Sequence, residues 1–340
     1  MAQVVVILNP LAGGGRGKRR KDQLARAMQQ AGLCFDIVET RETGDGIQLA
    51  ADAHRGGAQI VVAAGGDGTV NEVINGLALA ANRPVVPCAP RGAPISDLPP
   101  IDPPAVDPQP ADPARGVGTL ALCPIGTAND LADMLDLPRK VDLLVQRIVQ
   151  GRTRRIDLGC CLLKSPDRQL LRYFGNNMGL GFEAQVTLES YKIKWMQGAP
   201  RYLVAVLAAI RHFHSPQVEL EWRRPDDTWE RRSQPMLLVS LGNSERTGGM
   251  FYVTPGASVD DGLLRMATAR KVSTAGILRL LPQVLRGTHG NDPAVEIDDC
   301  RELRYSCAAG VPVHLDGEVV MEDVVSAHVV VQPRCLEIIV

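Results

Sequence analysis

The sequence predicts an α/β plus β protein: an N-terminal doubly wound parallel sheet domain followed by a C-terminal antiparallel β-sandwich domain. Three observations predict this. The chain has 340 residues, more than a single hydrophobic core usually organises. Its first half alternates short β-branched runs with helical patterns, which is typical of a parallel sheet covered by helices on both faces. After about residue 155, apolar and polar residues alternate in short runs, which favours antiparallel strands.

The first half contains four predicted strands and three predicted helices. Residues 4–9 form an apolar run of the kind buried in parallel sheets. The elements that follow are a helix over 19–30, a strand over 34–40, a helix over 46–54, a strand over 59–66, a helix over 71–79 and a strand over 119–127.

The second half is predicted to be mainly strands. Its strand-like runs cover 171–179, 217–224, 235–243, 263–270, 295–300, 302–307, 311–318, 328–333 and 335–340. Two helices interrupt them, one from Ala199-Pro200 to about residue 213 and one over 273–286. Pro200 stands where it would start the first of these helices.

These patterns divide the chain into residues 1–152 and residues 153–327, with the strand at 328–340 free to return to the first domain. Between residues 88 and 118 the sequence is crowded with proline and lacks periodicity, which predicts an extended surface loop inserted before a strand. Binding of a partner by this loop is the less favoured interpretation.

Composition narrows the class of protein. Hydrophobic residues make up 45% of the chain and charged residues 22%, as in an ordinary globular protein. The net charge of −1 gives no general attraction for nucleic acid or for anionic membranes. The apolar run at 202–210 is far shorter than the roughly 20 residues that a spanning helix needs. The expected location is therefore the cytoplasm, with peripheral contact at the inner membrane face left open.

The strongest local signal is the segment 64–72, AGGDGTVNE, in which an apolar strand runs into a glycine turn and then opens a helix. Glycines allow the backbone to approach phosphates closely, and the N-terminus of a helix offers free N–H groups to an anion. Asp67 lies within this turn, where burial would be costly unless it met a cation or a hydrogen-bond donor. An ordinary strand–turn–helix with Asp67 as a cap is the alternative.

Two further loops follow apolar strands in the same way, PIGTANDLA at 124–132 and NPLAGGGRGK at 9–18. The turns at the carboxyl ends of neighbouring strands in a doubly wound sheet face one crevice, so a nucleotide site is plausible there. The loop at 9–18 does not fit a Walker A loop, because Ala12 and Arg19 occupy positions that need glycine and Ser or Thr. It does not fit the GxGxxG fingerprint either.

Together these loops resemble the diacylglycerol kinase catalytic domain shared by bacterial diacylglycerol kinases, sphingosine kinases and ceramide kinases. The resemblance continues through the second half. Its motifs there are RIDLG at 155–159, FGNNMGLGF at 174–182, the Gly248-Gly249 pair with TPGA at 254–257, DDGLL at 260–264 and LDGE at 315–318. Glu183 departs from the aspartate that is frequent in the family, and Arg16 or Lys18 must replace a lysine directly after the glycines.

The resemblance implies an ATP-dependent lipid kinase that uses Mg²⁺, with a nucleotide-binding domain at 1–152 and a lipid-substrate domain at 153–327. The residues expected to bind the nucleotide are Asn9, Gly13, Arg16, Gly65, Gly66, Gly68, Thr69, Glu72, Gly126, Thr127, Asn129 and Asp130. Asp67, Asp130 and Asp157 are expected to form an acidic network near Mg²⁺, and Asp261 to hold a second Mg²⁺ unless it only caps a turn. Glu318 is the expected general base, with Asp67 as runner-up.

Diacylglycerol is the preferred acceptor, with sphingoid bases, ceramide and other lipid alcohols as alternatives. NAD kinase also uses a GGDG turn between two such domains, and a catalytically silent lipid-binding module on this fold is a rival of another class. The predicted partner is a lipid alcohol at a membrane surface; neither nucleic acid nor a transmembrane segment is expected. A homodimer is compatible with the sequence, which does not fix the oligomeric state.

Overall fold

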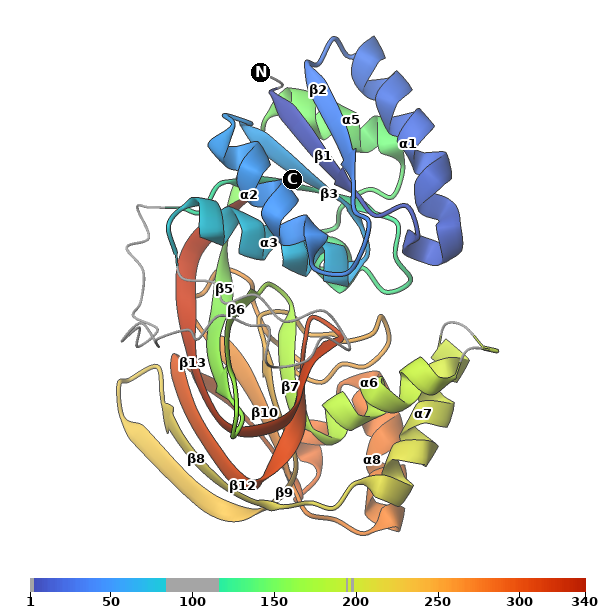
Figure 1. Cartoon of the computed structure of the whole chain (residues 1–340). Helices are drawn as coiled ribbons and strands as arrows, with labels where there is room; N and C mark the ends of the chain where they lie inside the picture. Colours follow the sequence, from blue (N-terminus) through green and yellow to red (C-terminus); the bar gives the residue numbers. More distant parts are fainter. Residues whose placement is uncertain (1–2, 84–115, 194, 197–198) are drawn as a thin grey trace.

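The computed structural model describes residues 3–83, 116–193, 195–196 and 199–340 (Figure 1). Most of the proline-rich loop predicted at 88–118 therefore lies outside the described residues. Within the described part of the chain, no helix is long and apolar enough to cross a membrane.

The first half alternates strands and helices as its sequence pattern predicts. Its elements are β1 (Val4–Leu8), α1 (Ala12–Gln30), β2 (Phe35–Glu39), α2 (Asp45–Arg55), β3 (Ile60–Gly65), α3 (Asp67–Ala80), β4 (Thr119–Pro124), α4 (Asp130–Met134) and α5 (Val141–Gln150). The ladders between β1 and β2, β1 and β3, and β3 and β4 are all parallel.

The second half is built from antiparallel ladders and three long helices. Its elements are β5 (Thr153–Lys164), β6 (Gln169–Phe174), β7 (Asn177–Gly181), α6 (Phe182–Lys192), α7 (Ala199–His212), β8 (Gln217–Arg223), β9 (Trp229–Gly242), β10 (Leu264–Arg270), α8 (Thr274–Arg286), the short 3₁₀ helix η2 (His289–Asn291), β11 (Val295–Cys300), β12 (Glu302–Leu315) and β13 (Glu318–Ile339).

Helices cover both faces of the parallel sheet because alternate residues of each strand are buried on opposite sides. In β1, Val4 and Val6 pack with the apolar side of α1 and α5, whereas Val5 and Ile7 pack with α2 and α3. Figure 1 shows α1 and α5 on one side of the strands and α2 and α3 on the other. The strand order β4-β3-β1-β2 places β1 and β3 side by side although α1 and α3, which follow them, lie on opposite faces. This is the switch point at which ligands bind in such sheets.

β13 joins the two halves. Its last residues pair in parallel with β4, at Glu337 with Thr119, while the rest of the strand pairs in antiparallel fashion with β5 and β12. The thirteen strands therefore form one hydrogen-bonded sheet. One hydrophobic core lies mainly in the first half of the chain and another in the second half. The sequence analysis left the strand at 328–340 free to return to the first domain, and in the structure the end of β13 pairs with β4.

Among the residues that the structure describes, α6 is a helix that the sequence analysis did not predict. The helix α6 has little amphipathic pattern because polar Thr187, Glu189 and Ser190 are buried on it together with Ala184 and Val186. A periodicity argument depends on one apolar and one polar face, so it gives no signal for such a helix.

Candidate active site

The three glycine-containing loops converge at the carboxyl edge of the parallel sheet. A Cβ added to Gly126 would lie 2.5 Å from the Cα of Gly66, so the turns after β3 and β4 contact each other by backbone. The Arg16 guanidinium donates to the carbonyl of Gly13 at 2.9 Å and to that of Ile125 at 3.2 Å. Arg16 thus ties the first loop to the turn after β4, and its contacts are with backbone carbonyls.

The first loop passes through the left-handed region at Gly13, Gly14 and Gly15, whose φ angles are +60°, +69° and +86°. Three successive residues in this region would be strained with any side chain other than glycine. A Cβ on Gly14 or Gly15 would meet nothing within 4 Å, so this backbone borders open space. The loop can therefore accept a ligand close to its main chain.

Other predicted nucleotide-site residues are linked to one another around these loops. The Asn9 amide donates to the hydroxyl of Thr69 at 3.3 Å, and any side chain on Gly65 would overlap Thr69. Glu72 accepts the backbone N–H groups of Gly44 and Gly46 at 2.7 and 2.9 Å, which anchors the start of α2.

Asp67 and Asp130 form a pair of neighbouring carboxyl groups. The Asp67 carboxylate accepts the backbone N–H groups of Asn129 and Asp130, both at 2.8 Å, and so fixes the turn after β4. Burial raises the pKa of Asp67 to about 6. Burial, and then the charge of Asp67, raise the pKa of Asp130 to about 8. One proton is therefore retained by the pair near neutral pH, as expected for two acids that share a site.

Asp130 also connects the first half with the second. Its carboxylate accepts the backbone N–H of Gly249 at 2.9 Å. One helical turn further on, Asp133 lies 3.3 Å from the guanidinium of Arg246. The loop containing residues 246–249 is therefore attached to the short helix α4.

Asp316 is the central buried acid between the halves, and the sequence reasoning assigned it no role. Its side chain accepts the backbone N–H groups of Gly175, Asn176 and Asn177 at 2.8–3.1 Å, and the amide of Asn71 on α3 at 2.8 Å. The sequence signal that could have identified Asp316 is its place in the LDGE motif at 315–318. Asp316 joins the GGDG helix to the FGNNMG segment.

Glu318 is the first residue of β13, two positions after Asp316, and its side chain is exposed. Its carboxylate contacts Gly68 so closely that a Cβ at residue 68 would overlap Oε1 of Glu318. Residues 250 positions apart in the sequence, Gly68 and Glu318, thus meet beside Asp67. The residue predicted as base therefore lies against the GGDG turn.

Asp157 and Asp261 lie in a different group of acids. The Asp157 carboxylate accepts the N–H groups of Gly262 and Arg334 at 2.7 and 2.6 Å, which fastens the DDG turn to β13. Asp261 accepts the N–H of Leu263 at 3.0 Å, and its charged neighbours include Asp299. Of the predicted acidic network, the structure brings together Asp67 and Asp130.

The donor set fits Mg²⁺ bound together with phosphate. Among the residues that the structure describes, no three His, Cys, Asp or Glu side chains form a metal cage. Mg²⁺ does not need one, because it keeps several waters and takes one or two carboxylates together with substrate phosphates. Asp67 and Asp130 provide two such carboxylates beside the glycine loops.

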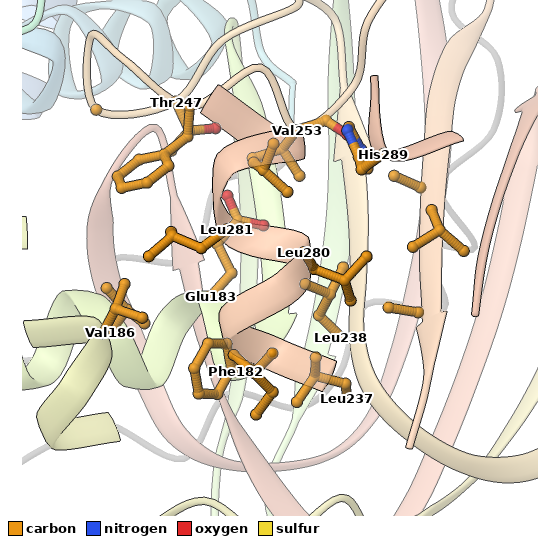
Figure 2. Close-up of a pocket in the computed structure, with 18 of the residues that line it drawn as sticks. Phe182, Glu183, Val186, Leu237, Leu238, Thr247, Val253, Leu280, Leu281 and His289 are labelled. Carbon is orange, nitrogen blue, oxygen red and sulfur yellow. The ribbon is translucent and has the colours of Figure 1, made fainter. Parts of the chain in front are cut away.

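An apolar cavity of about 120 Å³ lies in the second half (Figure 2). Its wall comes from α6, α7, α8 and the strands β9 and β10, through residues such as Phe182, Val206, Leu237 and Leu280. His289 contributes one polar ring, which bonds the carbonyl of Val253 at 3.0 Å. Burial lowers the pKa of His289, so the ring is neutral in this apolar wall.

The cavity adjoins the carboxyl pair. Gly248 lines the cavity, and the next residue, Gly249, donates its N–H to Asp130. Tyr202 also lines the cavity, and burial raises the pKa of this phenol against the opposing charge of Arg201, with Asp130 and Asp67 adding to the rise. An apolar compartment and an acidic, phosphate-compatible site are therefore contiguous.

Glu183 lies between this cavity and the sheet. Its Oε1 is 3.2 Å from Nε2 of the buried His314 and accepts the Asn177 amide at 3.1 Å. Burial alone would raise the pKa of Glu183, but the neighbouring His314 outweighs it and the pKa is lowered. Through these contacts Glu183, at the start of α6, is attached to His314 on β12 and to Asn177 on β7.

Comparison with known proteins agrees with the arrangement of motifs. Residues 3–161 match the diacylglycerol kinase catalytic domain, and residues 176–340 match the YegS C-terminal NAD kinase beta sandwich-like domain. A diacylglycerol kinase of Bacillus subtilis is 28% identical over 321 residues, which cover 94% of this chain and 90% of the relative. A YegS-like lipid kinase of Chromohalobacter salexigens is 27% identical over 292 residues, which cover 86% of this chain and 79% of the relative.

Solved structures show the same fold. The crystal structure of a diacylglycerol kinase from Bacillus anthracis superposes with a TM-score of 0.66 at 18% identity, covering 99% of this chain and 96% of the other. Yeast NADH kinase in complex with NADH superposes with a TM-score of 0.51 at 12% identity, covering 99% and 83%. The two matches together span almost the whole sequence: the chain combines a diacylglycerol kinase catalytic domain with a YegS C-terminal NAD kinase beta sandwich-like domain.

Proposed function

We propose that this protein is an ATP-dependent lipid kinase that transfers the γ-phosphate of ATP to the hydroxyl of a lipid alcohol, with diacylglycerol as the first candidate acceptor. The observation that carries the proposal is the apolar cavity next to the Asp67–Asp130 pair, joined to it through Gly248 and Gly249. A kinase for a lipid needs an apolar site for the chain next to a polar site for the phosphates. A soluble dinucleotide would have no use for the cavity.

On the donor side, the glycine loops would receive the phosphates of ATP. The backbone at Gly14 and Gly15 is open to a ligand, and the turns at Gly66 and Gly126 contact each other nearby. Asp67 and Asp130 would hold Mg²⁺, which neutralises charge on the phosphates when it is bound. A cation there would also favour the ionised form of Asp130, whose pKa is raised by burial and by the charge of Asp67.

On the acceptor side, Glu318 is the proposed general base. It is exposed at the junction of the two halves and contacts Gly68 of the GGDG turn. Asp67 is the second choice, because both of its carboxylate oxygens already accept backbone N–H groups. A base in hydrogen-bond reach of the hydroxyl contributes roughly 10²–10⁴-fold to the rate.

The helix α7 would carry the contact with the membrane. Within α7, the segment from Tyr202 to Ile210 has no charged side chain. On one side of the helix Leu207 is 55% exposed, and on the other side Tyr202 and Val206 line the cavity. Arg201 and Arg211 flank this apolar run, as suits an interfacial helix on anionic lipid. The lipid would pass from the bilayer to the cavity along α7.

The test is transfer of label from γ-labelled ATP with Mg²⁺ to a panel of lipid alcohols in mixed micelles, with NAD as control acceptor. Label on diacylglycerol supports the first candidate, and label on a sphingoid base or ceramide keeps the kinase and changes its acceptor. Label on NAD alone would favour the NAD kinase alternative. No label on any acceptor would favour a catalytically silent lipid-binding module.

A further inference from the structure

A second pocket lies away from the glycine loops, between α1 and the start of α5. It has a volume of about 330 Å³, within the roughly 300–1,000 Å³ usual for small-molecule sites. One face of α1 provides Arg20, Gln23, Arg26 and Gln30, and the first residues around α5 provide Lys140 and Asp142. Residues three or four apart share a helix face, so the α1 side chains line the pocket along its length.

The pocket holds positive charge that the protein does not neutralise. Arg20, Arg26 and Lys140 outnumber the single acid Asp142, giving a local charge of 3 − 1 = +2 in a chain whose net charge is −1. No carboxylate in the described residues forms an ion pair with any of the three cations. Within the described ranges, Arg20 donates to the side chain of Gln23 and to the carbonyl of Arg139.

Neighbouring basic residues behave differently. Lys21 on α1 is paired with Glu39 at 2.7 Å, and Arg139, next to Lys140, is paired with Asp133 at 2.7 Å. The three pocket cations are therefore set apart from the ion pairs around them. Like charges gathered in one concavity raise its potential, and an anion that enters relieves their mutual repulsion.

We propose that this pocket binds a phosphate group as an anion site distinct from the glycine loops. The forked guanidinium groups of Arg20 and Arg26 suit phosphate oxygens, and Lys140 adds a compact charge. The amides of Gln23 and Gln30 provide neutral donors for the rest of a headgroup. A phospholipid headgroup and a soluble phosphate ester share this chemistry.

The pocket is separate from the site proposed for ATP. The glycine loop occupies the N-terminal end of α1, whereas Gln30 is the last residue of this 19-residue helix. The residues that line the pocket include neither those of the GGDG turn nor Glu318. Its function can therefore be tested by binding alone, whether or not the protein proves to be a lipid kinase.

The experiment compares the double variant Arg26→Gln/Lys140→Gln with a charge-matched control, Arg19→Gln/Arg152→Gln. Arg19 and Arg152 are exposed, lie on α1 and just after α5, and do not line the pocket. The probes are glycerol 3-phosphate in titration calorimetry, and phosphatidylcholine vesicles with and without phosphatidate in a sedimentation assay. Because a hydrogen bond from a charged side chain contributes to the free energy of binding a phosphate, the pocket variant should bind each probe at least about tenfold more weakly than the wild type does. The control variant should bind the probes as tightly as the wild type.

Weaker binding of glycerol 3-phosphate by the pocket variant alone supports a site for soluble phosphate esters. Weaker binding only of phosphatidate vesicles supports a site for lipid headgroups. Equal binding by both double variants, for both probes, would overturn the proposal. In the wild-type protein, protection of Lys140 from acetylation by the probe, with exposed Lys164 as reference, gives the same answer without a substitution.

Discussion

Several residues of the candidate active site are held in position by close contacts or by several hydrogen bonds with neighbouring residues. Gly68 lies against the Glu318 carboxylate, Gly126 lies against Gly66, and Asp316 takes three backbone N–H groups at once. The glycine turns were predictable from sequence, because glycines after apolar strands indicate a close backbone approach. Asp316 was not, because its partners are main-chain groups some 140 residues away, which no spacing reveals.

Substituting Gly68 tests the contact with Glu318. We expect Gly68→Ala to lower kcat by about 10²-fold or more, because the new methyl displaces the proposed base. Melting temperature should change little, since residue 68 is the second residue of α3, where alanine is a good helix former, and the methyl meets the end of a flexible side chain. In a double-mutant cycle with Glu318→Gln, the double variant should be no slower than the slower single variant. Additive losses would show that the two residues act independently.

The acid pair gives a prediction about pH. The pKa of Asp130 is raised to about 8, so between about pH 4 and pH 8 the folded protein holds a proton that the unfolded chain has lost. Stability therefore falls as pH rises through this window. Asp130→Asn imitates the protonated acid and still accepts the N–H of Gly249, so without Mg²⁺ and ATP it should melt at least about 2 °C above wild type at pH 8.

The same substitution should stabilise the protein less at pH 5, where the wild-type acid is already protonated. Asp136→Asn, an exposed acid two residues after α4, is the control and should show no such dependence on pH. A gain of equal size at both pH values, or a gain only at pH 5, would contradict the raised pKa of Asp130.

Among the secondary-structure elements, α6, α7 and α8 shape the cavity, and they differ in how far the sequence predicts them. The helices α7 and α8 were predicted from Pro200 and from their apolar spacing, and the structure contains them at 199–212 and 274–286. The helix α6 was missed because it buries polar residues beside apolar ones. The cavity itself could not be predicted, because it depends on how these three helices pack against β9 and β10.

Filling the cavity with a larger side chain should weaken binding of a lipid acceptor and leave binding of ATP unchanged. Val206→Phe adds a ring on the cavity side of α7, so KM for a long-chain lipid alcohol should rise at least about tenfold, while KM for ATP stays unchanged. Leu278→Phe, on the exposed side of α8 and outside the cavity lining, is the matched control. The measurement is steady-state kinetics with long-chain and short-chain acceptors. Equal effects of both substitutions, or a change confined to ATP, would exclude this cavity as the chain site.

The molecule as a whole is more continuous than its sequence suggests. The change of pattern near residue 155 does not reveal that β5 and β13 each run from one core to the other, or that β13 ends in a parallel ladder with β4. The paired residues Thr153 and Ile339 are 186 positions apart in sequence, so only the fold shows their pairing.

This continuity predicts cooperative unfolding. Since β13 pairs with β4 in the first half and with β12 in the second, neither core should unfold without disrupting the other. All three tryptophans lie in the second half, whereas far-UV circular dichroism also follows the helices of the first half. The two signals should give coincident urea transitions. Separate midpoints would mean that the halves unfold independently.

The most direct test of the account is label transfer from γ-labelled ATP to diacylglycerol by the wild type, Asp67→Asn and Glu318→Gln. Glu322→Gln serves as the control, because Glu322 is exposed on the same strand as Glu318 and lies outside the site. We predict transfer by the wild type and the control, and losses of roughly 10²–10⁴-fold in the two site variants, which should remain folded. Wild-type rates in both site variants would contradict the proposed active site.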